Sequence, residues 1–336
     1  MGGAFGWRAS QATARPFISS CPRRPDDRAV VLRGLILHPL LRSRGRAFDL
    51  GGPSPMKEIA PHIYVSTEHP GVNVGFIVVP AGAIAVDAPT LPGDARAWRQ
   101  RIIETAGGPI LYVVLTDAHP DRLLSAGVLE APIVAARGAY ERASAYTEGF
   151  WRGVVESWTR RYPEAADDLA EAHIVLPEVM FTSRLTLHKG GMDVTVERVS
   201  GAAPGSAWIY LPEQDVLFAG DTLVAESHPF LAAAPDTRAW LSTLRSLRRP
   251  RFSKTRFVPG RGPLCDQSAT RPLSEYIALA RRRVRSLHTA RRARVDTASL
   301  VAELLPLFPV PNDERELVQR RIKAGLDRLY EELRPA

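Results

Sequence analysis

The stretch Leu115-Thr-Asp-Ala-His-Pro-Asp-Arg122 carries the clearest chemical signal in this chain of 336 residues. It follows an apolar run, residues 110–115, whose length and β-branched content predict a buried strand. Asp117, His119 and Asp121 stand at alternate positions after that strand, so their side chains can converge at its end. Carboxylates and imidazoles gathered in this way hold a divalent metal ion and the water that it activates. The stretch therefore predicts a metal site of the kind used for hydrolysis.

Outward from this stretch the chain alternates strands and helices. Strands are expected at 63–65, 72–79, 83–86, 110–115 and 133–135, and again at 184–188, 193–199, 206–211, 216–219 and 256–258. Helices are expected at 92–106, 122–130 and 237–248, the first ended by Gly107-Gly108. Two halves of strand–strand–helix character, with the helices outside, predict an α/β fold of the four-layer αβ/βα sandwich type.

Two helical regions extend this sandwich. Residues 137–173 contain several aromatic residues and predict a helical insertion, which either covers a pocket or forms a plain packing pair. Two long helices are expected to end the chain. The last carries an apolar stripe through Val318, Ile322, Leu326, Leu329 and Leu333, which is typical of a packed helix. We therefore expect a sandwich domain over 56–270 and a helical extension, packed on it, over 271–336.

The first 55 residues differ in composition from the rest. They hold nine arginines against three aspartates, a net charge of +6, whereas the whole chain has +8. They show no convincing apolar periodicity, so we expect a disordered basic leader, or a start that truly lies at Met56. Because most of the positive charge belongs to this leader, we expect no nucleic-acid partner for the body.

The bulk composition excludes two further classes of protein. The longest apolar run, residues 74–86, is broken by Pro80-Ala81-Gly82 and is too short for a bilayer, so no membrane association is expected. Cys21 and Cys265 stand far apart and predict no disulfide framework, which makes a reducing cytoplasm the default location. The oligomeric state is left open.

Five segments, taken in order, resemble the metallo-β-lactamase superfamily over residues 59–266. Besides the opening stretch they are Val72–Ile77 with Ala83–Asp87, Gly201-Ala-Ala-Pro-Gly-Ser206, Leu217-Phe-Ala-Gly-Asp-Thr222 and Val258-Pro-Gly-Arg-Gly-Pro263. They are similar to the opening strand pair, the His-x-His-x-Asp-His signature, the Gly-His-Thr-Pro-Gly-Ser turn, the Leu-Phe-Thr-Gly-Asp strand end and the Val-Pro-Gly-His-Gly-Pro loop. The resemblance implies the same sandwich fold and a hydrolase ancestry.

The resemblance also implies seven ligand positions for two metal ions. The first ion would use Asp117, His119 and Ala202, and the second Asp121, Arg122 and Arg261, with Asp221 bridging. Three family ligands are retained, namely His119, Asp121 and Asp221, and Asp117 replaces a fourth with another oxygen ligand. Ala202, Arg122 and Arg261 are substitutions that cannot bind a cation, because a methyl group and a protonated guanidinium offer no lone pair.

The substitutions leave two functions open. In the first, one divalent ion (zinc, manganese or iron) remains, and water orientated by Asp121 as catalytic base hydrolyses an ester, thioester, lactone or lactam. In the second, no metal is bound, and Arg122 and Arg261 form salt bridges with the site carboxylates of a pseudoenzyme or anion-binding protein. The partner is then a small-molecule substrate or an anionic ligand. His228 is either at the pocket rim or an ordinary loop histidine.

Overall fold

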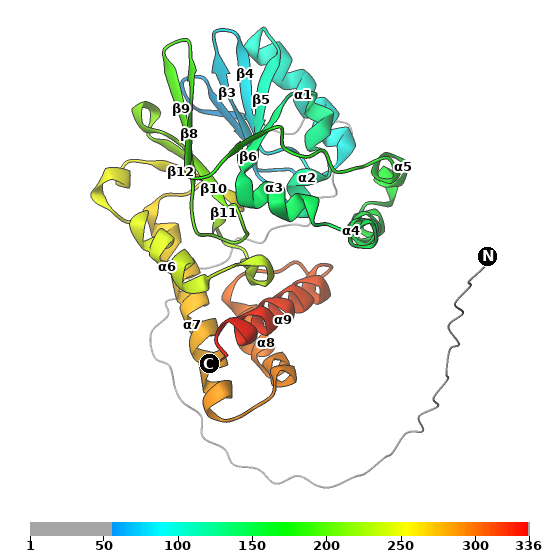
Figure 1. The fold of residues 1–336 in the computed structure, drawn as a ribbon, viewed down its shortest axis with the longest axis vertical. Helices are drawn as coiled ribbons and strands as arrows, with labels where there is room; N and C mark the ends of the chain where they lie inside the picture. Colours follow the sequence, from blue (N-terminus) through cyan, green and yellow to red (C-terminus); the bar gives the residue numbers. More distant parts are fainter. Residues whose placement is uncertain (1–55, 335–336) are drawn as a thin grey trace, which may run out of the picture. The chain divides into compact units, whose positions relative to one another are not determined.

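The computed structural model describes residues 56–334, and the predicted basic leader, residues 1–55, lies outside them. Within the described residues two β-sheets lie face to face, with helices on their outer faces (Figure 1). None of the helices in this part of the chain combines the length and the apolar composition that crossing a bilayer requires.

The first sheet is mixed. Within residues 56–334 its order is β1 (Lys57–Ala60), β2 (Ile63–Ser66), β3 (Val74–Val79), β4 (Gly82–Val86), β5 (Ile110–Val114), β6 (Ile133–Ala136) and β7 (Val179–Phe181). Strands β1 to β4 pair antiparallel through short turns, whereas β4 to β7 pair parallel and are joined by helical crossovers. The parallel half brings the carboxyl ends of β4 and β5 to the same edge.

The second sheet has the order β12 (Arg256–Arg261), β11 (Val216–Val224), β10 (Ala207–Leu211), β9 (Met192–Arg198) and β8 (Arg184–Lys189). Only the β11–β12 pair is parallel among these strands. All nine residues of β11 are buried, as expected for a strand covered on both faces. The predicted strands are confirmed, with shifts of a few residues at their ends.

Three apolar clusters define four layers. The inner cluster joins the sheets through side chains such as Ile77, Ile84 and Ile209. The cluster on the outer face of the first sheet includes Trp98 of α1 (Pro92–Ala106) and residues of α3 (Arg137–Ser144). The cluster on the outer face of the second sheet includes Trp240 of α6 (Thr237–Ser246). The predicted αβ/βα sandwich is confirmed.

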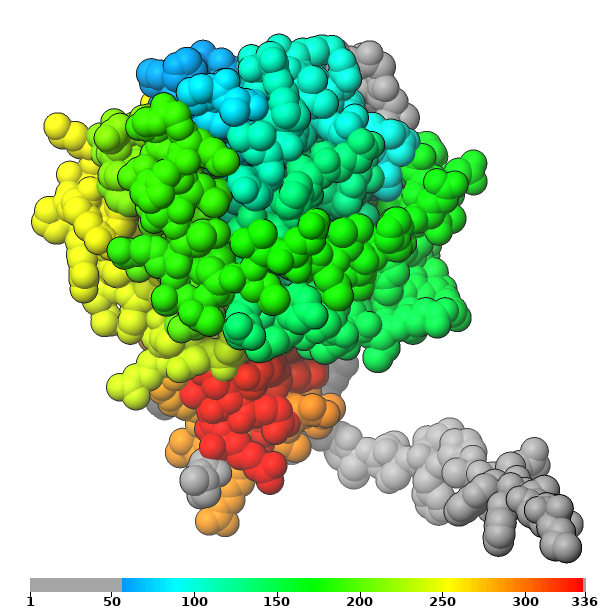
Figure 2. Space-filling model, turned by 45° about the horizontal axis from the view of Figure 1, so that its top comes forward, coloured from blue at the N-terminus to red at the C-terminus, as the bar shows by residue number. Residues whose placement is uncertain are grey.

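The C-terminal helices share the outer cluster of the second sheet. Side chains of α7 (Thr270–Thr289), α8 (Val301–Leu304) and α9 (Arg315–Glu332) pack with α6, β11 and β12. In Figure 2 the red and orange atoms of these helices adjoin the yellow-green segment that contains α6. The apolar stripe of the last helix faces this cluster: Leu326 and Leu329 are fully buried and Val318 and Ile322 nearly so. These helices therefore belong to the core beside the site.

Some elements differ from the sequence-based prediction. The helix expected at 122–130 is a short α2 (Pro120–Leu123) followed by a separate 3₁₀ turn at Ala126–Leu129, because Pro120 starts the helix early and Ser125 leaves helical geometry. The strands β1 and β7 were not predicted, since each has only three or four residues and two exposed side chains. The insertion at 137–173 contains α3, α4 (Glu148–Arg161) and α5 (Ala166–Ala170).

Two glycines allow the sheets to meet closely at the site. Gly220 has φ of +52° at an irregularity in β11, and a Cβ there would lie 2.5 Å from the Thr116 side chain. Gly260 lies beside the Arg122–Asp221 contact, where a Cβ would lie only 2.1 Å from Asp221 Oδ1. A side chain at either position would force the strand ends apart, so these glycines permit the convergence described next.

Candidate functional site

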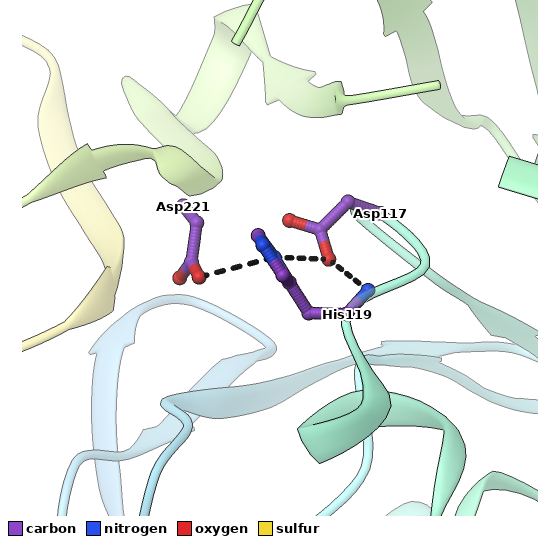
Figure 3. Close-up of side chains that lie close together, drawn as sticks. All are labelled: Asp117, His119 and Asp221. Carbon is purple, nitrogen blue, oxygen red and sulfur yellow. Dashed lines mark hydrogen bonds and ion pairs between the residues drawn. The ribbon is translucent and has the colours of Figure 1, made fainter. Parts of the chain in front are cut away.

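Asp117 and His119, in the loop after β5, converge with Asp221, which lies within β11. One ligand atom from each residue lies within 4.8 Å of the others, and all three side chains are buried. His119 Nδ1 is 3.1 Å from Asp117 Oδ1 and 3.3 Å from Asp221 Oδ2 (Figure 3). The Asp117 carboxylate is fixed by the backbone N–H of His119, which donates to Oδ1 over 2.9 Å. The loop after β5 and the distant strand β11 thus supply one group of three.

Some nitrogen and oxygen atoms of this group make no hydrogen bond and could therefore bind a cation. Asp117 Oδ2 and both ring nitrogens of His119 are buried and make no hydrogen bond within the described residues. Buried polar atoms are normally satisfied, so unpartnered lone pairs pointing together indicate an ion or an unplaced proton. Phe230 packs edge-on against the imidazole, with ring centroids 5.5 Å apart, and holds the ring in position. Two carboxylates and an imidazole suit manganese, iron or zinc.

Arg122 is fully buried among three carboxylates. Its Nη2 donates to Asp221 Oδ1 over 2.7 Å and its Nε donates to Asp87 Oδ2 over 3.0 Å. Its Nη1 is 3.5 Å from Asp117 Oδ1. Thr116 completes the arrangement, because its hydroxyl donates to Asp87 and accepts from Arg122. The guanidinium is a fixed internal counter-ion that is not available to a ligand.

Arg261, at the end of β12, binds the second oxygen of Asp221 and also binds Asp121. Its Nη2 donates to Asp121 Oδ2 at 3.0 Å and to Asp221 Oδ2 at 3.1 Å, and its Nε donates to Asp221 Oδ2 at 3.2 Å. Its Nη1 donates to the carbonyl of Gly71. The resemblance assigns Asp121 and Asp221 to the second ion, and guanidinium nitrogens now bond to both. These residues do not fit a second cation.

The electrostatics of the group follow from these contacts. Burial raises the pKa of Asp117 and Asp221, but the charges of Arg122 and His119 together, joined at Asp221 by that of Arg261, outweigh it and hold each pKa below its usual range. Burial lowers the pKa of His119, but Asp117 and Asp221 outweigh it and the pKa ends above its usual value. Burial leaves the pKa of Asp87 raised despite Arg122. The site is therefore a buried ion-pair network, in which the charges of the arginines, His119 and the carboxylates compensate one another.

Asp121, the predicted catalytic base and second-site ligand, lies outside the group of three. Its Oδ1 accepts from the indole N–H of Trp158 over 3.2 Å, and its Oδ2 accepts from Arg261. Burial raises the pKa of Asp121, but Arg261 and Arg321 outweigh it and the pKa ends lowered. The carboxylate is thus held ionised and orientated by α4 on one side and β12 on the other.

The remaining predicted positions lie apart from the ion-pair network. Ala202 is fully buried in the apolar cluster around α6 and contributes no polar atom. His228 is buried, with Nδ1 3.3 Å from Tyr276 Oη and Nε2 3.2 Å from the Leu305 carbonyl. It also lines a cavity of about 260 Å³ together with Arg261. Its role at the rim stays a prediction.

Four residues of the site were not identified as site residues from sequence, namely Thr116, Trp158, Phe230 and Arg321. Thr116 stands inside the opening stretch, so its position was a usable signal. The other three come from α4, the loop after β11 and α9, and no local pattern marks them. Only the packing of these distant elements brings them to Asp121 and His119.

Comparisons with known proteins identify the family and the fold of the chain. A family model described as the metallo-beta-lactamase superfamily matches residues 69–261. No curated protein gives a significant match.

Solved structures share the fold at low sequence identity. They include a metallo-beta-lactamase from Pontibacter korlensis, with 18% identity, 67% of this chain and 98% of that chain covered, and a TM-score of 0.54. A metallo-beta-lactamase family protein from Thermus thermophilus has 19% identity, coverage of 82% and 95%, and a TM-score of 0.58. A stereoselective inverting sec-alkylsulfatase from Pseudomonas sp. has 17% identity, coverage of 83% and 50%, and a TM-score of 0.62. The chain thus spans half the length of the alkylsulfatase.

Proposed function

The chain belongs to the metallo-beta-lactamase superfamily, and from that premise we propose that it is a hydrolase that holds a single divalent cation on Asp117, His119 and Asp221. The observation that carries the proposal is the convergence of these three buried residues, in which Asp117 Oδ2 and both ring nitrogens of His119 make no hydrogen bond within the described residues. Arg122 and Arg261 take over the charge of a second ion. The solved structures of similar fold include lactamases and an alkylsulfatase, which are hydrolytic enzymes by name.

The charge balance supports one cation and not two. The ion-pair network contains two guanidinium groups and four buried carboxylates, which are those of Asp87, Asp117, Asp121 and Asp221. With His119 neutral, two negative charges remain, which one divalent ion neutralises. A second ion would leave two positive charges in a dry interior, at a cost of several kcal/mol.

Each residue of the site would then have a separate role in hydrolysis. A bound cation would supply Lewis acidity and lower the pKa of a water molecule. Asp117 and Asp221 would fix its place, because Arg122 and the His119 backbone hold their carboxylates. Asp121 would orient the attacking water. Its lowered pKa keeps the carboxylate ionised, so it would accept a hydrogen bond from the water without readily taking up a proton. The substrate would be an ester, thioester, lactone or lactam.

The test is metal analysis joined to activity. Protein purified without added ions is expected to hold about one equivalent of zinc, manganese or iron. Turnover of a panel of esters and lactones should require that ion and be lost in His119→Ala. The matched control is His188→Ala, because His188 is exposed on β8, where it pairs with Asp193. No bound metal, and turnover that chelator and His119→Ala leave unchanged, would refute the proposal.

A metal-free site is the second candidate, and one observation favours it. The His119 imidazole lies within ion-pair distance of both Asp117 and Asp221, so a proton on the ring balances part of the same charge. The protein would then be a pseudoenzyme in which the ion-pair network stabilises the fold and binds no metal. Its melting temperature should be unaffected by chelator and by added zinc, whereas a one-metal hydrolase gains stability from the ion by mass action.

A further inference from the structure

Phe230 is a large apolar side chain that packs on polar and charged groups. Its half-buried ring lies edge-on against the His119 imidazole, with centroids 5.5 Å apart. The Cζ atoms of Arg261 and Arg321 lie 4.1 and 4.5 Å from its centroid. The ring belongs to none of the apolar clusters that residues 56–334 form. Aromatic rings stabilise a fold mainly by burial among apolar side chains, so a role in the core does not account for this one.

The backbone on both sides of Phe230 is anchored. Leu231, the next residue, is buried in the apolar cluster on the outer face of the second sheet. It packs so closely on α9 that a Cβ at Gly325 would lie 2.9 Å from the Leu231 Cβ. Pro229, on the other side, is also buried. The loop after β11 therefore holds the Phe230 ring at the site, away from the core to which its neighbour belongs.

A cavity of about 260 Å³ begins at Phe230. Its apolar wall is formed by the loop after β11, the segment before α9 and α9 itself, through Phe230, Val310, Val318 and Ile322. Phe230 contacts His119 as well, so one aromatic ring stands between this cavity and a proposed metal ligand.

The charges on the cavity wall cancel. Arg261 and Arg321 line the cavity together with Glu226 and Glu314. Burial lowers the pKa of His228, another residue of the wall, so its ring is uncharged near neutral pH. A mainly apolar space with no net charge on its wall favours a neutral apolar group over an ion.

The volume limits how much of a molecule can enter. An apolar cavity of about 150 Å³ is enough to hold one benzene molecule. By this scale the cavity beside Phe230 holds one ring or a short chain, and not two linked rings. Phe230 sets this limit on the side of the site, because its ring occupies the space between the cavity and His119.

We propose that this cavity is a subsite for a neutral apolar group of the size of a single ring, and that Phe230 is the specificity-determining residue that sets its depth. The rest of the ligand would extend past Phe230 towards His119. As a statement about substrate class, this rests on the proposed hydrolytic function. The binding itself depends only on the cavity and the Phe230 ring, and it requires no metal ion.

The experiment compares benzyl alcohol with 4-biphenylmethanol, which carries a second ring. Dissociation constants are measured by ligand-observed NMR on the full chain in chelator. In the wild type the second ring should change the affinity by less than about twofold, because the cavity has no room for it. In Phe230→Ala it should raise the affinity about tenfold or more, since it then fills the space of the deleted ring and buries its own surface.

Two further variants and one spectroscopic signal control for indirect effects. Phe150→Ala removes an exposed phenylalanine of α4 that does not line this cavity, so both ligands should bind as they do to the wild type. Val310→Phe places a ring in the cavity and should weaken benzyl alcohol about tenfold or more. In Phe230→Ala, 4-biphenylmethanol should also shift the imidazole proton signals of His119, because its second ring then lies against them.

Each outcome bears on the subsite or on the function. The subsite is overturned if the second ring raises the affinity equally in the wild type and Phe230→Ala, or if Val310→Phe leaves benzyl alcohol binding unchanged. The expected binding pattern without ester turnover supports the subsite and counts against the hydrolytic function. Metal-dependent turnover of ethyl acetate by a protein that binds neither alcohol does the reverse. Melting curves identify a variant that fails to fold, and Phe230→Leu, which removes less volume, then takes the place of Phe230→Ala.

Discussion

Substitution of Arg122 provides the sharpest test of the ion-pair network. Its guanidinium is fully buried and donates to Asp87 and Asp221, so Arg122→Gln would leave carboxylates in a dry interior without their counter-ion. Removing one partner of a buried ion pair costs about 3–5 kcal/mol. At about 2 °C per kcal/mol for a domain of this size, the melting temperature should fall by roughly 6–10 °C.

The loss should also depend on pH. In the wild type the pKa of Asp117 and of Asp221 is depressed, so their stabilisation is complete above the unfolded pKa and is lost only as pH falls through the folded pKa. Without Arg122 these folded pKa values rise, and the folded variant takes up protons as pH falls. The difference in unfolding free energy between variant and wild type should therefore be smaller at pH 5 than at pH 8.

The assay is urea unfolding at both pH values in chelator, so that no metal ion replaces the lost charge. Arg152→Gln is the control, because Arg152 makes an exposed pair with Glu148 and should be almost neutral. A loss below about 1 kcal/mol, or the same loss at pH 5 and pH 8, would refute the view that Arg122 replaces a cation.

Three further predictions concern neighbouring parts of the site. Because the pKa of His119 is raised, its contribution is full below the unfolded pKa and lost as pH rises through the folded one, so in chelator the wild type should lose stability as pH rises above about 6.5 and His119→Gln should not. Urea titrations check this, and a parallel slope in the variant would contradict it. Gly260→Ala should lower the melting temperature by several degrees, since its Cβ would overlap a site carboxylate. Gly153→Ala, on an open helix face, should instead raise it slightly; equal effects would refute the close approach. Trp158→Phe should cost about 1.5–3 kcal/mol by removing a hydrogen bond to an ionised carboxylate. If calorimetry shows no change, Asp121 does not depend on α4.

Local pattern predicted most of the fold for identifiable reasons. The helix at Pro92–Ala106 has the predicted limits, because a proline begins it, a left-handed Gly107 ends it and Trp98 and Ile102 repeat at helical spacing. The strands β3, β4 and β11 are mainly apolar runs in which nearly every residue is buried, so both faces of each strand are covered. The short edge strands β1 and β7 escaped prediction, because their pairing with neighbours and not their composition makes them strands.

The sequence by itself determined the residue types of the site and the chemistry that those types exclude. An arginine has no lone pair, so neither Arg122 nor Arg261 can itself be a ligand of a cation, wherever it lies. Only the tertiary structure decided which carboxylates these arginines meet. The contact of Arg122 with Asp221 spans 99 positions, and that of Arg261 with Asp121 spans 140. Periodicity within a window of a dozen residues carries no information about such pairings, which exist only when two sheets close face to face. For the same reason Arg321, two hundred positions away from Asp121, lies near the site only through the packing of α9.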